Sequence, residues 1–141
     1  MPEEEQGQQQ MMQQYQQVQQ QMEQVEEFLE QVDENLEELS TTRDAIEDLG
    51  DVEEGSEILA RLGSGVMVTA EIKDTEKVIT NIGGDYFEER TRENAQEVLE
   101  SRKQDLEETQ QELNSTMEEL QQQMQKMQQQ FQQMQQEQQQ Q

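Results

Sequence analysis

The sequence predicts an α+β protein: a long antiparallel coiled-coil helical hairpin with two small β-hairpins at the helix-connecting end. Three observations lead to this fold class. Apolar residues repeat every seven positions in the first and last thirds of the chain, the middle third changes to an alternating pattern, and apolar residues are scarce throughout.

Composition limits what the chain can do. Only 29% of its 141 residues are hydrophobic, which is too little for one compact core. The choices left are disorder or long helices that each bury a narrow apolar stripe. The chain has no cysteine and no histidine, so thiol and histidine catalysis and the usual ligands of zinc, copper and iron are missing. We therefore expect no enzyme activity, no cofactor and no metal.

The formal net charge is −25, from 34 acidic and 9 basic residues. Such a surface repels nucleic-acid phosphates and anionic lipids, so we expect neither nucleic acid nor a membrane as a partner. The charge could attract a basic partner, but we favour solubility in a salty cytoplasm, and hence a halophilic archaeon as the source. No apolar stretch is long enough to span a membrane, and the first residues do not resemble a signal peptide. The expected location is cytoplasmic.

The first predicted domain, residues 1–50, contains a helix from about residue 8 to Leu49, with Gly50 as its C-terminal cap. Two columns of seven-residue spacing, offset by three, predict a left-handed coiled coil. The columns are Tyr15, Met22, Leu29, Leu36 and Arg43, and Met11, Val18, Val25, Val32, Leu39 and Ile46.

The last predicted domain, residues 91–141, is a second coiled-coil helix with Thr91 as its N-cap. One column runs from Leu99 to Met134 in steps of seven. Its companion column is predicted to move by one residue near 116–117, from Ala95, Arg102, Thr109 and Thr116 to Met117, Met124 and Phe131. Two helices of similar length suggest an antiparallel hairpin with both chain ends at one tip.

The middle domain, residues 51–90, reads as a linker and two β-hairpins. The predicted strands are Glu57–Leu62, Val66–Ile72, Val78–Ile82 and Tyr86–Glu89, with glycine turns at 63–65 and 83–85. A further turn is predicted at 73–76, and the alternation on both sides of it is also typical of a β-hairpin. Such a piece is too small to be stable alone, and its apolar side chains on both faces predict pairing with other chains. The predicted oligomerisation residues are Val66, Met67, Val68, Ile72, Val78, Ile79 and Ile82.

Three segments resemble the prefoldin alpha family: LGSGVMVTA at 62–70, DTEKVITNIGGDYFEE at 74–89 and ENAQEVL at 93–99. The resemblance implies a cytosolic hexamer of two alpha and four beta subunits, whose hairpins form a double β-barrel from which coiled coils project. It also implies an ATP-independent chaperone that grips non-native clients at the coiled-coil tips and passes them to a group II chaperonin. The glutamine-rich ends and the acidity depart from the family's usual pattern.

Six of the nine methionines lie near the predicted tip, Met1 among them. Methionine is unbranched and polarizable, so it can repack around varied clients. The candidate client-binding residues are Met11, Met12, Tyr15, Val18, Met124, Met127, Phe131 and Met134. The alternative is that they only close the coiled coil, because most of them occupy heptad core positions; Met12 lies one residue off the seam.

Residues 121–141 contain 15 glutamines. They could form hydrogen-bonding arms around a client, but we favour a solvated low-complexity tail, in part helical. Two other functions remain open: a structural coiled-coil scaffold without holdase activity, and a disordered glutamine-rich regulator. The alternating middle segment argues against a pure spacer, and the sustained heptads argue against disorder.

Overall fold

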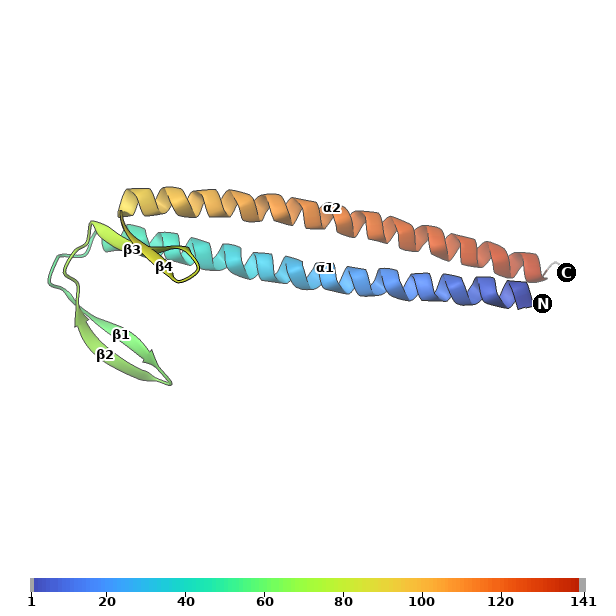
Figure 1. Cartoon of the computed structure of the whole chain (residues 1–141), viewed down its shortest axis with the longest axis horizontal. Helices are drawn as coiled ribbons and strands as arrows, with labels where there is room; N and C mark the ends of the chain where they lie inside the picture. The colour runs from blue at the N-terminus through green and yellow to red at the C-terminus, as the bar shows by residue number, and fades with distance from the viewer. Residues whose placement is uncertain (1, 140–141) are drawn as a thin grey trace. The chain divides into compact units, whose positions relative to one another are not determined.

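The computed structural model describes the backbone of residues 2–139 and the side chains of residues 5–137 and 139. Met1 and the last two glutamines of the predicted C-terminal helix lie outside these residues. The elements follow in the order α1 (Pro2–Leu49), β1 (Glu57–Gly63), β2 (Val66–Glu71), β3 (Lys77–Gly83), β4 (Tyr86–Thr91) and α2 (Arg92–Gln139) (Figure 1). Two long helices with two antiparallel β-hairpins between them confirm the predicted fold class.

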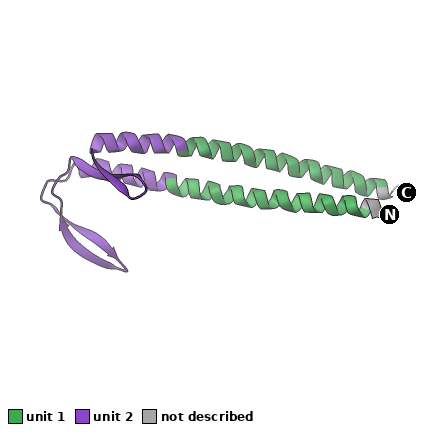
Figure 2. Cartoon of the chain, in the orientation of Figure 1, with its two compact units in different colours: residues 1–35, 106–141 green, residues 36–105 purple. Residues whose placement is uncertain are grey.

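The chain divides into two compact units (Figure 2). Unit 1 comprises residues 1–35 and 106–141, and unit 2 comprises residues 36–105. Within unit 1, α1 and α2 lie side by side and antiparallel, with the two ends of the chain together (Figure 1). Unit 2 holds the rest of both helices and all four strands.

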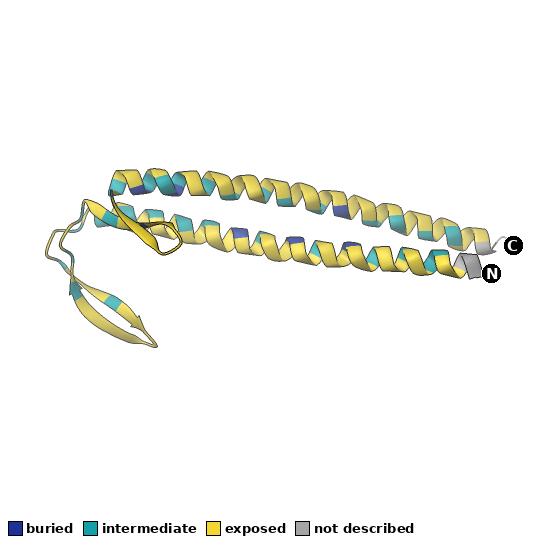
Figure 3. Ribbon diagram, in the orientation of Figure 1, coloured by how far each residue is buried: buried dark blue, intermediate teal, exposed yellow. Residues whose placement is uncertain are grey.

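α1 confirms both predicted heptad columns. Val18, Val25 and Val32 are buried, and the other column members are half-buried, while most residues between them are exposed (Figure 3). The helix begins at Pro2, about six residues earlier than predicted. Glutamine and glutamate are good helix formers, and proline is tolerated in a first helical turn, so the polar start continues the helix.

The core of unit 1 is a narrow seam. Val18, Val25 and Leu120 are buried together, and methionine and leucine side chains pack against them. These are Met22, Leu29, Leu113, Met117, Met124 and Met127. A seam of this width buries little apolar surface per residue, as the composition requires.

The predicted shift of the companion column in α2 is wrong. Arg102, Thr109 and Thr116 are exposed, whereas Lys103 and Gln110 are half-buried. The column is therefore continuous, and its first half is polar: Gln96, Lys103, Gln110, Met117, Met124 and Phe131. Long polar side chains can line a seam with their alkyl stems while the head groups reach water, so hydrophobicity alone does not reveal the column.

In unit 2, polar groups tie the two helices where the seam contains Arg43. Its Nη1 contacts Glu100 Oε2 at 2.5 Å, and the Gln96 side-chain amide donates to the Arg43 carbonyl at 2.9 Å. Both charged side chains are about a third or more exposed, so the ion pair contributes at most about 1 kcal/mol. Ala95 and Leu99 supply the buried apolar contacts of this region.

The helix boundaries in unit 2 follow local chemistry. Thr91 is the N-cap of α2, because its hydroxyl accepts a hydrogen bond from the Asn94 amide at 3.1 Å. α1 ends at Leu49 as predicted, and the Gly50 amide donates to the Glu47 carbonyl at 3.0 Å. Gly50 does not have positive φ, so it is not a left-handed cap. A methyl group there would meet the Arg92 guanidinium, the movable end of a long side chain, and would lie 3.2 Å from the Glu47 carbonyl oxygen, a tight contact with the backbone.

The two β-hairpins match the predicted strands to within two residues. β1 pairs with β2 and β3 with β4, each antiparallel with a register shift next to the turn. The hairpin expected across residues 73–76 is wrong, because β2 and β3 belong to different sheets and this segment links the two hairpins. Ser64 and Gly65, in the first turn, both have positive φ, as the mirror-image turns of tight hairpins require. In the second turn the Asn81 side chain accepts from the Gly83 amide and donates to the Gly84 carbonyl.

Candidate functional site

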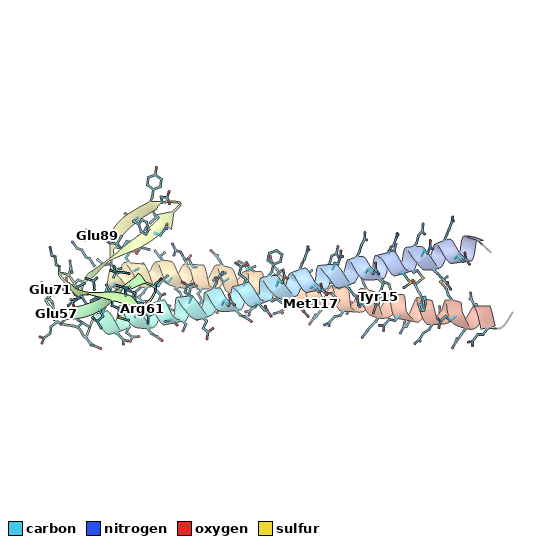
Figure 4. The ribbon with its side chains drawn as sticks, turned by 90° about the horizontal axis from the view of Figure 1, so that it is seen from below. Tyr15, Glu57, Arg61, Glu71, Glu89 and Met117 are labelled. Carbon is cyan, nitrogen blue, oxygen red and sulfur yellow. The ribbon has the colours of Figure 1, made fainter. Side chains whose placement is uncertain are left out.

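A groove in unit 1 brings together five of the eight predicted client-binding residues. Its volume is about 490 Å³. The lining residues are Met11, Met12 and Tyr15 from α1, and Met127, Gln128, Phe131 and Gln132 from α2. In Figure 4, Tyr15 and Met117 lie at the seam between the helices, and methionine sulfur atoms lie between the helices near Tyr15.

Met12 is the residue that most clearly points outward. Its exposed fraction is 59%, whereas Met11, Tyr15, Met127 and Phe131 are half-buried. The groove is thus a widening of the coiled-coil seam with one methionine at its edge. The side chains at the heptad positions therefore do two things here: they pack the two helices together, and they also form the lining of the groove.

The structure places the other three predicted residues outside the groove. Val18 is only 7% exposed and belongs to the seam core, so its side chain does not face the groove, and its role in client binding stays a prediction. Met124 packs against the same core. Met134 lies across from Gly7, where an added methyl group would come within 3.9 Å of the Met134 Cε atom.

Gln128 and Gln132 line the groove but were not among the predicted residues. Each follows a seam residue by one position, as Met12 does, and the same offset from the heptad would have identified all three. They bring amide groups and no charge to the groove. The predicted solvated tail is helical through Gln139 within the described residues.

The β1–β2 hairpin has one face that is apolar throughout. The register pairs Ile58 with Ala70 and Ala60 with Val68, and Val66 follows on the same face by alternation. The opposite face mixes apolar and charged side chains: Glu57, Leu59, Arg61, Met67, Thr69 and Glu71. Figure 4 labels Glu57, Arg61 and Glu71 on this hairpin.

The β3–β4 hairpin covers one of its faces in part. Val78 is half-buried and Thr80 is buried, and both alternate to the same face. The Asn81 carbonyl accepts a hydrogen bond of 2.6 Å from the Arg102 guanidinium of α2. On the other face, Ile79 and Phe87 are 74% and 64% exposed.

Five of the seven predicted oligomerisation residues are exposed, namely Val66, Met67, Val68, Ile79 and Ile82. Val78 and Ile72 are half-buried within the chain, and Ile72 extends the first hairpin through hydrogen bonds to Gly55 and Ser56. Further exposed apolar residues on the strands were missed by the prediction: Ile58, Leu59, Leu62, Tyr86 and Phe87. Leu62, Tyr86 and Phe87 stand next to the turns, whereas Ile58 and Leu59 lie near the start of β1.

Within the described residues, no group of three or more acidic side chains is arranged to hold a metal ion. None of the helices described is long and apolar enough to cross a membrane. The groove of unit 1 and the exposed apolar hairpins of unit 2 are the surfaces whose function is to be explained.

These features define a class: coiled-coil helical hairpins with two β-hairpins inserted between the helices. Comparison with known proteins gives the family. The model of the prefoldin subunit family matches residues 5–137, nearly the whole chain, and the chain belongs to this family.

Curated relatives include prefoldin alpha subunits, several from halophilic archaea, as the sequence resemblance predicted. The chain is 42% identical over 56 residues to the subunit of Halorubrum lacusprofundi, covering 40% of this chain and 37% of that protein. It is 39% identical over 61 residues to that of Haloarcula marismortui, covering 43% and 40% of the two chains. For Thermofilum pendens the values are 37% over 60 residues, covering 43% and 46%. These alignments span less than half of each relative.

A solved structure supports the fold. The chain superposes on the cryo-EM structure of filamentous PFD from Methanocaldococcus jannaschii with a TM-score of 0.74, covering 79% of this chain and 93% of that one. The sequence identity is 20%, so this likeness shows the fold alone.

Proposed function

We propose that the chain is a subunit of an ATP-independent cytoplasmic chaperone. In this proposal it binds non-native proteins in the groove of unit 1, prevents their aggregation and delivers them to a group II chaperonin. The observation that carries the proposal is the groove itself, which is lined by three methionines, among them the exposed Met12, and by two aromatic residues. Holding of this kind is a binding function and needs no catalytic group.

The chemistry of the groove suits weak and unselective capture. Burying one leucine- or phenylalanine-sized side chain gains about 1.5–3 kcal/mol, which alone corresponds to millimolar binding or weaker. Methionine side chains change rotamer easily, so the groove can accept apolar groups of different shape. Weak contacts become useful when several coiled coils hold one client at the same time.

Such multivalency requires assembly, for which the hairpins are suited. The apolar face of β1–β2 and the exposed Ile79 and Phe87 of β3–β4 leave apolar surface open to water. Other prefoldin subunits are the proposed occupants, most simply two copies of this chain with four beta subunits. The strands would join across subunits, which also satisfies their open edges.

The test is suppression of aggregation. The full chain is mixed with a beta-type prefoldin subunit in high salt without ATP, and light scattering of a diluted denatured client is followed. The proposal predicts suppressed scattering at a molar ratio near one complex per client.

A structural scaffold without holdase activity is the alternative, supported by the position of most groove residues at heptad core sites. Unsuppressed scattering by a complex of confirmed mass would favour this alternative. Transfer to a chaperonin is tested separately, by the yield of refolded client after a group II chaperonin and ATP are added.

A further inference from the structure

Charge is absent from one part of this acidic chain. Residues 6–22 contain no charged residue, and residues 120–136 contain one, Lys126. We call these two stretches the neutral belt. By contrast, residues 23–56 contain fourteen acidic residues and one basic residue.

The groove lies entirely within the neutral belt. Its lining residues fall between 11 and 15 on α1 and between 127 and 132 on α2. The nearest acidic residues along the helices are Glu5 and Glu137, six residues before Met11 and five after Gln132. At 1.5 Å per residue these distances are about 9 and 7.5 Å, close to the Debye length of about 8 Å at physiological salt.

Folding does not require this neutrality. Glutamine and glutamate have nearly the same helix propensity, so either would support α1 and α2. The outward positions of α1 between residues 23 and 38 are mostly acidic, so acids at such positions are compatible with the coiled coil. The glutamines around the groove stand where acids would also be compatible with the helices, so their neutrality bears on what the groove binds.

We infer that the groove is adapted to acidic clients: non-native chains that expose apolar side chains among many carboxylates. This inference rests on the proposed client-binding function and names the class of client. The chain itself, with a net charge of −25, is one polypeptide of this kind. An acidic groove would repel such chains, whereas a neutral one admits their apolar side chains without a charge penalty.

The test uses three fluorescent peptides with one apolar centre, flanked by glutamates, serines or lysines. Their dissociation constants are measured by anisotropy for the full chain assembled with a beta-type subunit. The wild-type complex should bind the glutamate- and serine-flanked peptides within about threefold of each other at physiological salt, where screening removes most of the distant charge.

The variant Gln128→Glu/Gln132→Glu places acids in the groove. It should weaken the glutamate-flanked peptide on the order of tenfold at low salt, since the two added carboxylates repel the glutamates of the peptide at close range and little salt screens them. High salt should restore binding, and the serine-flanked peptide should be little affected. The matched control is Gln104→Glu/Gln111→Glu, which adds the same charge to exposed positions of α2 away from the groove and should change nothing.

Two results would overturn the inference. In one, the wild-type complex prefers the lysine-flanked peptide tenfold or more, so that the acidity of the whole chain dominates. In the other, the groove variant weakens all three peptides equally. If no peptide bound the wild-type complex at any salt concentration, the proposed client-binding function itself would fail.

Discussion

Met12 and Val18 lie six residues apart on α1 and have opposite environments. Met12 is 59% exposed at the edge of the groove, and Val18 is 7% exposed in the seam core. Both are apolar and close to the chain end, so composition alone assigns them the same role. Their environments differ because of their heptad positions, which decide whether a side chain faces α2 or solvent.

Replacing these two residues by serine should separate client binding from stability. Met12→Ser should weaken suppression of client aggregation while leaving the thermal unfolding of the coiled coil unchanged, because no seam contact is lost. Val18→Ser should lower stability by about 2 kcal/mol, since it leaves a cavity and a buried hydroxyl in the seam. Circular dichroism on heating and light scattering provide the two readouts; a Met12→Ser protein with full holding activity would argue against the groove.

At the scale of elements, substitutions in the polar half of the α2 column test which residues of α2 face α1. Gln110 is half-buried in the continuous column, and its side-chain amide donates to Asp33 at 2.8 Å. Gln110→Leu should raise the stability of the coiled coil by about 1 kcal/mol, because the apolar contacts that it adds in the seam outweigh the loss of the solvent-exposed hydrogen bond to Asp33. The control Gln111→Leu, one residue along on the exposed side, should give no such gain. Equal effects of the two changes on the midpoint of thermal unfolding would contradict the assigned column.

The sequence predicted the elements better than it predicted the site. Heptads and alternation identified both helices and all four strands, because the spacing of apolar residues along the sequence can be read without knowledge of the fold. The polar column through Lys103 and Gln110 was missed, since long polar side chains can occupy seam positions that a hydrophobicity pattern does not show. Val18 was placed in the site, and Gln128 and Gln132 left out, because pairing of α1 with α2 determines which side chains line the groove.

At the scale of the whole molecule, the apolar hairpins should control assembly. Val68→Asp or Ile82→Asp should lower the mass in solution of the complex with beta subunits while helical content stays mostly intact, since a charge in an apolar interface is costly. Thr69→Asp is the matched control for the first variant, because Thr69 is exposed on the mixed face of the same strand. An unchanged mass for Val68→Asp and Ile82→Asp would exclude these residues from the interface.

The opposite end of the chain should be dispensable for assembly. Deleting residues 1–14 and 124–141 removes most of the groove but none of the strands. The truncated protein is expected to reach the mass of the full complex and to suppress client aggregation poorly. Light scattering with mass measurement checks both points, and failure of the truncated chain to assemble would contradict this division of roles.

The central claim, that clients are held in the groove of unit 1 without ATP, is tested most directly by site-specific photo-crosslinking. A photoreactive residue is placed at Met12, at Gln128 or at Gln104, and the assembled complex is irradiated with a denatured client in the absence of ATP. Crosslinks to the client are expected from positions 12 and 128 and few from position 104, which lies on the same helix as Gln128 but does not line the groove. Equal crosslinking from all three positions, or crosslinking from position 104 alone, would contradict the central claim.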